Sequence, residues 1–414
     1  MPDAARLQRL WRAHGRSILA CAVTVMAAVA TAWLGYEFYR LLLQPERIGS
    51  VAIHPGAIDL KLLHRMVNAW FAGEPVYTGP HAYLNTYPPA SMALIAPVYG
   101  WHEPSAAMLA WIVGAVAALA WLLPQLVRES GAETRLERAF VALMPLAIYP
   151  TGAVIGNGQL TLFVLPLALA GLLLLRSRDG SWGRDVVASL LIVAALAKPA
   201  VAAPFFLIAA FAVGSFRPAL LICAAYAALT LFAATFQPMG VVAQLRHFFT
   251  LAAAMSVAAG EANLHILLAD HGLTGWIAPA SLAVLALLAV WVWRHRRVDL
   301  WLLIGVVAIA ARFWTYHRWY DDLLILLPML ALFRIAKRSP ASDRLDLAAG
   351  TLLGLTLAFM LAPGGLYLLP APWNRICVDV QVLIWLSDLA LLIVAAARER
   401  TKEAVAARPG DRLA

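Results

Sequence analysis

The sequence has few charged residues for its length. Asp, Glu, Lys and Arg make up 13% of its 414 residues, whereas hydrophobic residues make up 62%. This composition excludes an ordinary soluble protein and predicts an all-α polytopic membrane protein. Cysteine is also scarce. Cys21, Cys223 and Cys377 are widely separated and form no CxxC pattern, so neither a disulfide framework nor a zinc site is predicted.

Two further motifs are missing. There is no glycine-rich phosphate loop of the GxxxxGK[ST] type, which argues against nucleotide chemistry in the basic loops. No signal-peptide cleavage site precedes the first apolar run, 17–38, so we expect that run to remain as a membrane anchor.

The net charge of +9 is carried by short basic clusters between apolar runs. The positive-inside rule therefore places these clusters and both termini in the cytoplasm, and nucleic acid is not expected as a partner. Counting apolar runs gives about twelve transmembrane crossings. We expect one membrane domain over 1–397, external loops at about 39–87 and 237–275, a hairpin or broken helix at 88–101, and a cytoplasmic polar tail at 398–414.

The first external loop contains an amphipathic pattern. Apolar side chains recur with helical spacing over 58–71, which predicts a helix lying along the membrane surface and ending at Gly73. Asp59 lies in its first turn, where free backbone N–H groups favour an ionised carboxylate. Two interpretations stay open: Asp59 is a catalytic base, or it only caps a surface helix.

A lysine inside an apolar stretch is the second candidate residue. Lys198 stands within AALAKPAVAAPFF. A charge at the centre of the bilayer costs about 2.5–3.5 kcal/mol on insertion scales, so it should have a partner or a function. A lipid phosphate is one suitable partner, and Arg312, at the end of its helix, could complete a phosphate clamp. The alternative is that Lys198 extends to the lipid headgroups.

With this topology, the polar residues gather on the external side. They are Asp59, His64, His81, Tyr83, Tyr87, Asn157, Gln159, Lys198, His265, Arg312, His317, Arg318, Asp321 and Asp322. The rings around His317 suit an interfacial aromatic belt, and Asp321 and Asp322 suit helix capping. Asp388, inside the last apolar run, has no predicted role. Because nucleotide sugars and ATP are absent outside the cell, a synthetic reaction there needs an activated lipid.

Five segments occur in an order that resembles a known family. They are AWFAGEPVY after Asp59, then TYPPASMALIAP, GNGQLTLFVLPLALAGLLLL, ALAKPAVAAPFFL and HRWYDDLLILLPML, between about residues 57 and 335. Together they resemble glycosyltransferase family 87, whose members are polyprenyl-phosphate-dependent membrane enzymes of the GT-C superfamily. The resemblance implies a GT-C-type fold and an active site on the external face of the cytoplasmic membrane.

The resemblance also implies residue roles. The general base falls on Asp59, the Lys-Pro element on Lys198 and Pro199, the Gly-Gln element on 158–159, and the external histidine on His317. Some relatives have a two-acid metal motif in the first loop, but Leu60 and Lys61 follow Asp59 here, so no metal or other cofactor is expected. The EANLHILL run at 261–268 departs from the Asn-Gln-Ser-Leu type of run seen in relatives.

We therefore expect an inverting hexosyltransferase that moves mannose from a polyprenyl-phosphate donor to a lipid or glycan acceptor among membrane lipids. The expected catalytic residues are Asp59 and His317, and the expected donor phosphate ligands are Lys198 and Arg312. The expected substrate-binding residues are His64, Tyr87, Gln159, Arg318 and Asp322. Two other classes stay open: a transporter or flippase of an envelope intermediate, and a non-catalytic partner in an envelope complex.

Overall fold

The computed structural model describes residues 3–44, 47–48, 51–52, 55–78, 86–176, 181–259, 263–338 and 344–406. In these ranges the only strands are β1 (Arg47–Ile48) and β2 (Val51–Ala52), which pair antiparallel. The helices are α1 (Asp3–Leu43), α2 (Ile58–Phe71), α3 (Pro89–Tyr99), α4 (Pro104–Ser130), α5 (Arg135–Ala147), α6 (Tyr149–Asn157), α7 (Thr161–Leu175), α8 (Trp182–Ala195), α9 (Pro199–Phe211), α10 (Arg217–Ala234), α11 (Val241–Ala259), α12 (Leu264–Asp270), η2 (Thr274–Trp276), α13 (Ile277–Arg294), α14 (Leu300–Phe313), η3 (Trp319–Ile325), α15 (Leu326–Arg338), α16 (Arg344–Met360), α17 (Gly365–Leu368) and α18 (Trp373–Ala406).

The protein is a multi-pass membrane protein. Within the described residues, five helical segments are long and apolar enough to cross a membrane, and the bent pair α6 and α7 raises the number to six. The five segments lie in α1, α4, α10, α13 with η2, and α18. The predicted twelve crossings are not shown. Several apolar helices, including α3, α9 and α14, have only 11 to 14 residues, and a perpendicular span needs about 20.

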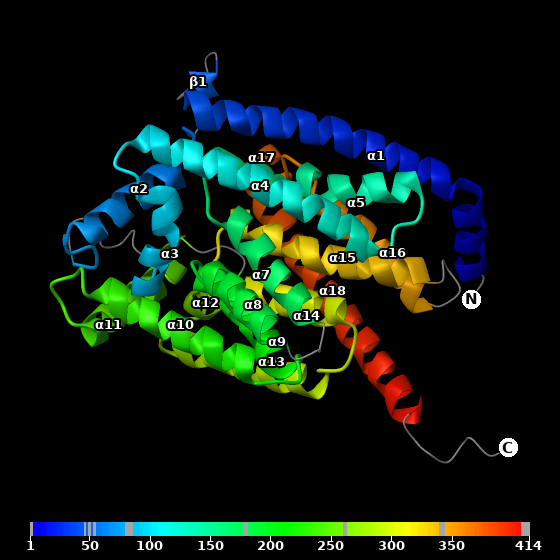
Figure 1. The fold of residues 1–414 in the computed structure, drawn as a ribbon. Coiled ribbons are helices and arrows are strands. Elements are labelled where there is room, and N and C mark those ends of the chain that lie inside the picture. The colour runs from blue at the N-terminus through cyan, green and yellow to red at the C-terminus, as the bar shows by residue number, and fades with distance from the viewer. Residues whose placement is uncertain are drawn as a thin grey trace.

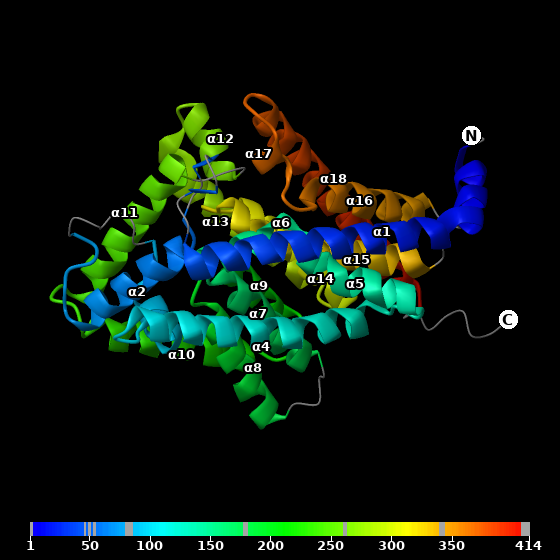
Figure 2. The ribbon, with the colours of Figure 1, turned by 90° about the horizontal axis from the view of Figure 1, so that it is seen from above.

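The long helices run along the molecule in Figure 1, and Figure 2 shows the same bundle from above. The beginning of α1 and the end of α18 lie toward one end in both views, whereas α2 and α11 lie toward the other end. α1 packs against α5 and α6, and α14 packs against α9, α15 and α18. α14 and α15 form the centre of the core, where nearly every side chain is buried.

Two predicted segments differ from the structure. Residues 88–101, for which we expected a hairpin or broken helix, contain the single helix α3 with Pro97 inside it. The apolar run 139–155, one of the twelve crossings counted from the sequence, is divided between α5 and α6. The chain is extended at Ile148, which forms an isolated β-bridge with Leu361.

A sharp bend separates α6 from α7, whose axes differ by 118°. Gly158 ends α6 with φ 67°, a left-handed conformation that glycine adopts most readily. A Cβ on Gly158 would lie 2.5 Å from Cβ of Leu60 in α2. The missing side chain therefore permits both the bend and the close approach of α2.

The helix α2 packs against protein rather than lying freely on a membrane surface. Its buried side chains are Leu60, Leu63, Met66, Val67 and Trp70, and its neighbours include α3, α4 and α6. The Trp70 indole donates a hydrogen bond to the Ala233 carbonyl of α10 (2.8 Å). The apolar periodicity thus predicted the helix correctly but not the surface that covers it.

Candidate active site

A cavity of about 1580 Å³ lies among α1, α2, α9, α11, α13 and the segment 314–320. One part of its wall is apolar and comes mainly from α11 and α13, with Leu245, Phe248, Phe249 and Leu282. Another part is polar. Its charged residues are Glu37, Arg40, Asp59, Lys198 and Arg318. An amphiphilic molecule with a polar head matches this division of the wall.

Asp59 lies in the first turn of α2 and faces the cavity. It does not cap the helix, because Ala57 is the N-cap residue and no side chain supplies a capping hydrogen bond. Instead, the N–H of Ala57 donates to the Gly156 carbonyl of α6 (2.7 Å), which ties the start of α2 to the bend. The capping interpretation of Asp59 is therefore wrong.

The surroundings of Asp59 suit a base that works near neutral pH. Burial raises the pKa of Asp59 to about 6, and the negative charge of Asp321 acts in the same direction. The positive charges of Lys198 and Arg318 oppose this increase in pKa. At pH 7 the carboxylate is thus mostly ionised yet more basic than an exposed aspartate.

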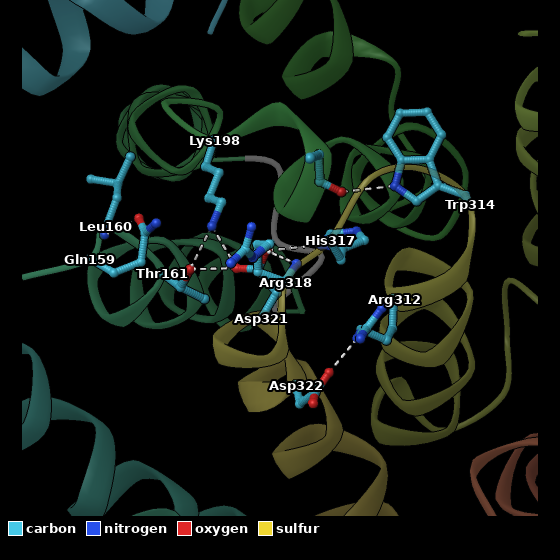
Figure 3. Close-up of polar contacts among 11 residues, drawn as sticks. Gln159, Leu160, Thr161, Lys198, Arg312, Trp314, His317, Arg318, Asp321 and Asp322 are labelled. Atoms are coloured by element: carbon cyan, nitrogen blue, oxygen red, sulfur yellow. Dashed lines mark hydrogen bonds and ion pairs between the residues drawn. The ribbon is translucent and has the colours of Figure 1, made fainter. Parts of the chain in front are cut away.

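Lys198 precedes α9 and forms a buried polar cluster with η3 and the start of α7 (Figure 3). Its Nζ lies 2.5 Å from Oδ1 of Asp321 and 3.0 Å from Oγ1 of Thr161. Thr161 donates to the same Asp321 oxygen (2.7 Å), and Nζ lies 4.7 Å from the centre of the Tyr320 ring. Lys198 also lines the cavity.

The second oxygen of Asp321 holds His317, at 3.2 Å from Nδ1. Burial would raise the pKa of Asp321, but Lys198 and His317 hold that pKa below its usual range. Burial lowers the pKa of His317, so a neutral ring donates Nδ1–H to an ionised carboxylate. His317 is fully buried and does not line the cavity.

Arg312 and Asp322 form a buried ion pair that is separate from the Lys198 cluster (Figure 3). Asp322 also accepts a hydrogen bond from the Tyr149 hydroxyl, and that hydroxyl accepts one from Gln381 of α18 (3.1 Å). Arg312 is 1% exposed and is absent from the cavity wall. Its guanidinium is therefore directed toward α6 and η3 rather than toward a ligand.

The structure brings five of the nine predicted site residues to one cavity: Asp59, Tyr87, Gln159, Lys198 and Arg318. The other four, His64, Arg312, His317 and Asp322, do not line it. His64 lies on the far side of α2, where Nε2 is 2.8 Å from the Trp101 carbonyl oxygen. Predicted external residues His81 and Tyr83 lie outside the described residues.

His265, to which the sequence pattern gave no role, also lines the cavity. Its Nε2 lies 2.6 Å from Oγ of Ser281, and that hydroxyl donates to the Trp314 carbonyl (2.8 Å). Because the hydroxyl proton is already used, Nε2 must carry the proton that His265 donates. Burial lowers the pKa of His265 to about 4, so the ring is neutral at pH 7.

Sequence reasoning also missed Thr161 and the pair Glu37 and Arg40. Thr161 lies two residues after Gln159, at the start of α7. The run around it otherwise predicts only an apolar helix. Glu37 and Arg40 are charged residues at the end of an apolar run, three positions apart. That spacing places both side chains on one face of a helix, so the sequence already indicated that they could pair.

Residues 85–322, more than half of the chain, match the model of glycosyltransferase family 87. The matched range contains Tyr87, Gln159, Lys198 and Arg318, whereas Asp59 precedes it. No curated protein and no solved structure matches the chain.

Proposed function

Because the chain belongs to glycosyltransferase family 87, we propose that this membrane glycosyltransferase moves a mannosyl group from a polyprenyl-phosphate donor to a hydroxyl of a lipid or glycan acceptor. The reaction takes place on the external face of the membrane and inverts the anomeric centre. The single observation that supports this proposal best is that Asp59 and Lys198, from separate helices, line one cavity with an apolar extension.

In the proposed step, Asp59 accepts the proton of the acceptor hydroxyl as its oxygen attacks the anomeric carbon. The bond from that carbon to the phosphate oxygen breaks, and polyprenyl phosphate leaves with the bonding electrons. Lys198 and Arg318, the two cations of the cavity wall whose charges lower the pKa of Asp59, stabilise the leaving phosphate. Arg318 takes the place we first expected for Arg312, since Arg312 faces away from the cavity.

Asp321 and His317 serve as positioning residues in this proposal. Asp321 fixes Lys198 at 2.5 Å, and His317 orients the carboxylate from its other side. The Asp321 charge also partly neutralises Lys198, so release of a phosphate is easier than from an unpaired ammonium. The prenyl chain would lie along the apolar wall formed by α11 and α13.

The test uses the full-length protein purified in detergent, with a radiolabelled polyprenyl-phosphate mannose donor and a crude lipid acceptor fraction. Wild-type protein should convert the label into a new product. Asp59→Asn should lower turnover by about 10²- to 10⁴-fold, the usual contribution of a general base. Lys198→Met should mainly weaken donor binding, which is measured as the donor KM.

The assay also separates the other classes. A flippase or an assembly partner does not consume the donor when no second membrane compartment is present. Wild-type protein that leaves the donor intact with every acceptor fraction, or an Asp59→Asn variant with native turnover, would rule out the mechanism. Ser387→Ala, an exposed position of α18, serves as a control for preparation and detergent.

A further inference from the structure

One face of α1 contributes four side chains to the cavity: Trp33, Tyr36, Glu37 and Arg40. The intervals of three, one and three residues place them along a single stripe of the helix. Glu37 and Arg40 are buried, whereas Trp33 and Tyr36 are half-buried. Because they lie in a candidate membrane span, charged side chains here are costly and indicate a function.

Glu37 and Arg40 form an ion pair that is incomplete in the described part of the structure. Nη1 of Arg40 lies 2.7 Å from Oε2 of Glu37. The other carboxylate oxygen, Oε1, is buried and has no hydrogen-bond partner there. A buried carboxylate oxygen without a donor is unfavourable, so a ligand that brings a hydroxyl group would gain from binding it.

The helix α6 holds this face in place. A Cβ on Gly156 would lie 1.8 Å from Oε2 of Glu37, and one on Gly152 would lie 2.1 Å from Nε1 of Trp33. The Trp33 and Glu37 side chains of α1 therefore lie directly against the α6 backbone. The Trp33 indole also donates to the Tyr149 carbonyl of α6 (3.2 Å).

The same contacts locate the face relative to Asp59. The Gly156 carbonyl accepts from the N–H of Ala57, two residues before Asp59. Nη2 of Arg40 lies 3.5 Å from the Pro55 carbonyl oxygen. The α1 face thus adjoins the first turn of α2, whereas Lys198 approaches from α9 and contacts η3.

The chemistry of this face suits a ring with several hydroxyl groups. A carboxylate and a guanidinium bind neighbouring hydroxyls, and the Trp33 and Tyr36 rings, with centroids 5.6 Å apart, offer apolar surfaces to the C–H groups of a sugar. Because Glu37 and Arg40 are paired with each other, the face has no net positive charge that would attract a phosphate. We propose that the α1 face, defined by Trp33, Tyr36, Glu37 and Arg40, binds the polyhydroxylated head of the acceptor. This inference rests on the proposed function, since it divides the cavity into an acceptor side and a donor side.

The test compares three variants on α1: Glu37→Gln, Tyr36→Leu and the control Tyr39→Leu. Tyr39 is 41% exposed and does not line the cavity. Loss of a charge-assisted hydrogen bond should raise the acceptor KM of Glu37→Gln by about tenfold, with the donor KM unchanged. Tyr36→Leu should act in the same direction, and it remains informative if Glu37→Gln fails to fold. An increase in the donor KM at constant acceptor KM, or no change in either, would overturn the inference.

A second measurement does not need turnover. Binding of methyl glycosides, used as soluble hydroxylated probes, is followed by saturation-transfer NMR on wild-type protein and on the same variants. Binding that is lost in Glu37→Gln or Tyr36→Leu but kept in Tyr39→Leu supports the α1 face even if the donor is never consumed, in which case only the proposed reaction fails. Probe binding that is equal in all four proteins contradicts the α1 face.

Discussion

The pH dependence of transfer provides a quantitative test of Asp59. A base must be deprotonated to accept the acceptor proton, so activity should fall as the pH drops through its pKa. Burial raises the pKa of Asp59 to about 6 from the ordinary 3.8. Ionisation then decreases from about nine-tenths at pH 7 to about one-tenth at pH 5. We expect kcat/KM for the donor, which reports on the free enzyme, to fall about tenfold between these two values.

The measurement is the initial rate at subsaturating donor from pH 4.5 to 8.5, with folding checked by size exclusion at each pH. Lys198→Met should move the acidic limb of its residual activity to higher pH, because the ammonium lowers the pKa of Asp59. His64→Gln tests whether the limb belongs to the neighbouring histidine of α2, and its midpoint should match that of wild type. A rate that stays flat from pH 7 to pH 5, or a limb that moves with His64→Gln, would refute the assignment to Asp59.

Two predictions concern stability. Arg312→Met leaves Asp322 as an unpaired buried charge and should destabilise the fold by about 3–5 kcal/mol, seen as a lower Tm in detergent; an unchanged Tm would contradict the buried pair. Gly152→Ala should also lower the Tm, since its Cβ would lie 2.1 Å from Nε1 of the rigid Trp33 ring. The control Gly35→Ala on α1 meets nothing within 4 Å, so equal Tm values for the two alanine variants would contradict the close packing of α1 and α6.

The hydrophobic composition predicted the helical membrane fold. The position of Lys198 within an apolar run predicted that it has a partner or a function. The predicted number of about twelve crossings is not shown, because apolar helices of 11 to 14 residues have the hydropathy of spans but only part of their length. Periodicity over 58–71 likewise predicted α2, but an apolar helical face does not reveal whether protein or lipid will cover it.

The partners of Arg312 depend on local geometry that the sequence does not display. Asp321 and Asp322 are neighbours in a 3₁₀ helix, where successive side chains point about 120° apart. One therefore meets Lys198, and the other meets Arg312. Helix capping, which we considered for both acids, fits Asp321 in part, since its Oδ2 lies 3.5 Å from the backbone nitrogen of Arg318. Capping does not, however, indicate the buried cations that pair with the two carboxylates. Their actual partners are Lys198, which is 123 residues from Asp321 in the chain, and Arg312, which is 10 residues from Asp322.

The bend between α6 and α7 interrupts backbone hydrogen bonding where the chain is buried inside the protein. Neighbouring helices close the gap: the Tyr99 hydroxyl of α3 donates to the Gly158 carbonyl (3.0 Å), and the N–H of Ala57 donates to the Gly156 carbonyl (2.7 Å). If α2 swung outward, the second of these carbonyls would lose its partner. Together with the buried apolar face of α2, this contact opposes outward movement of the helix that carries Asp59, so we expect substrates to enter through another side of the cavity.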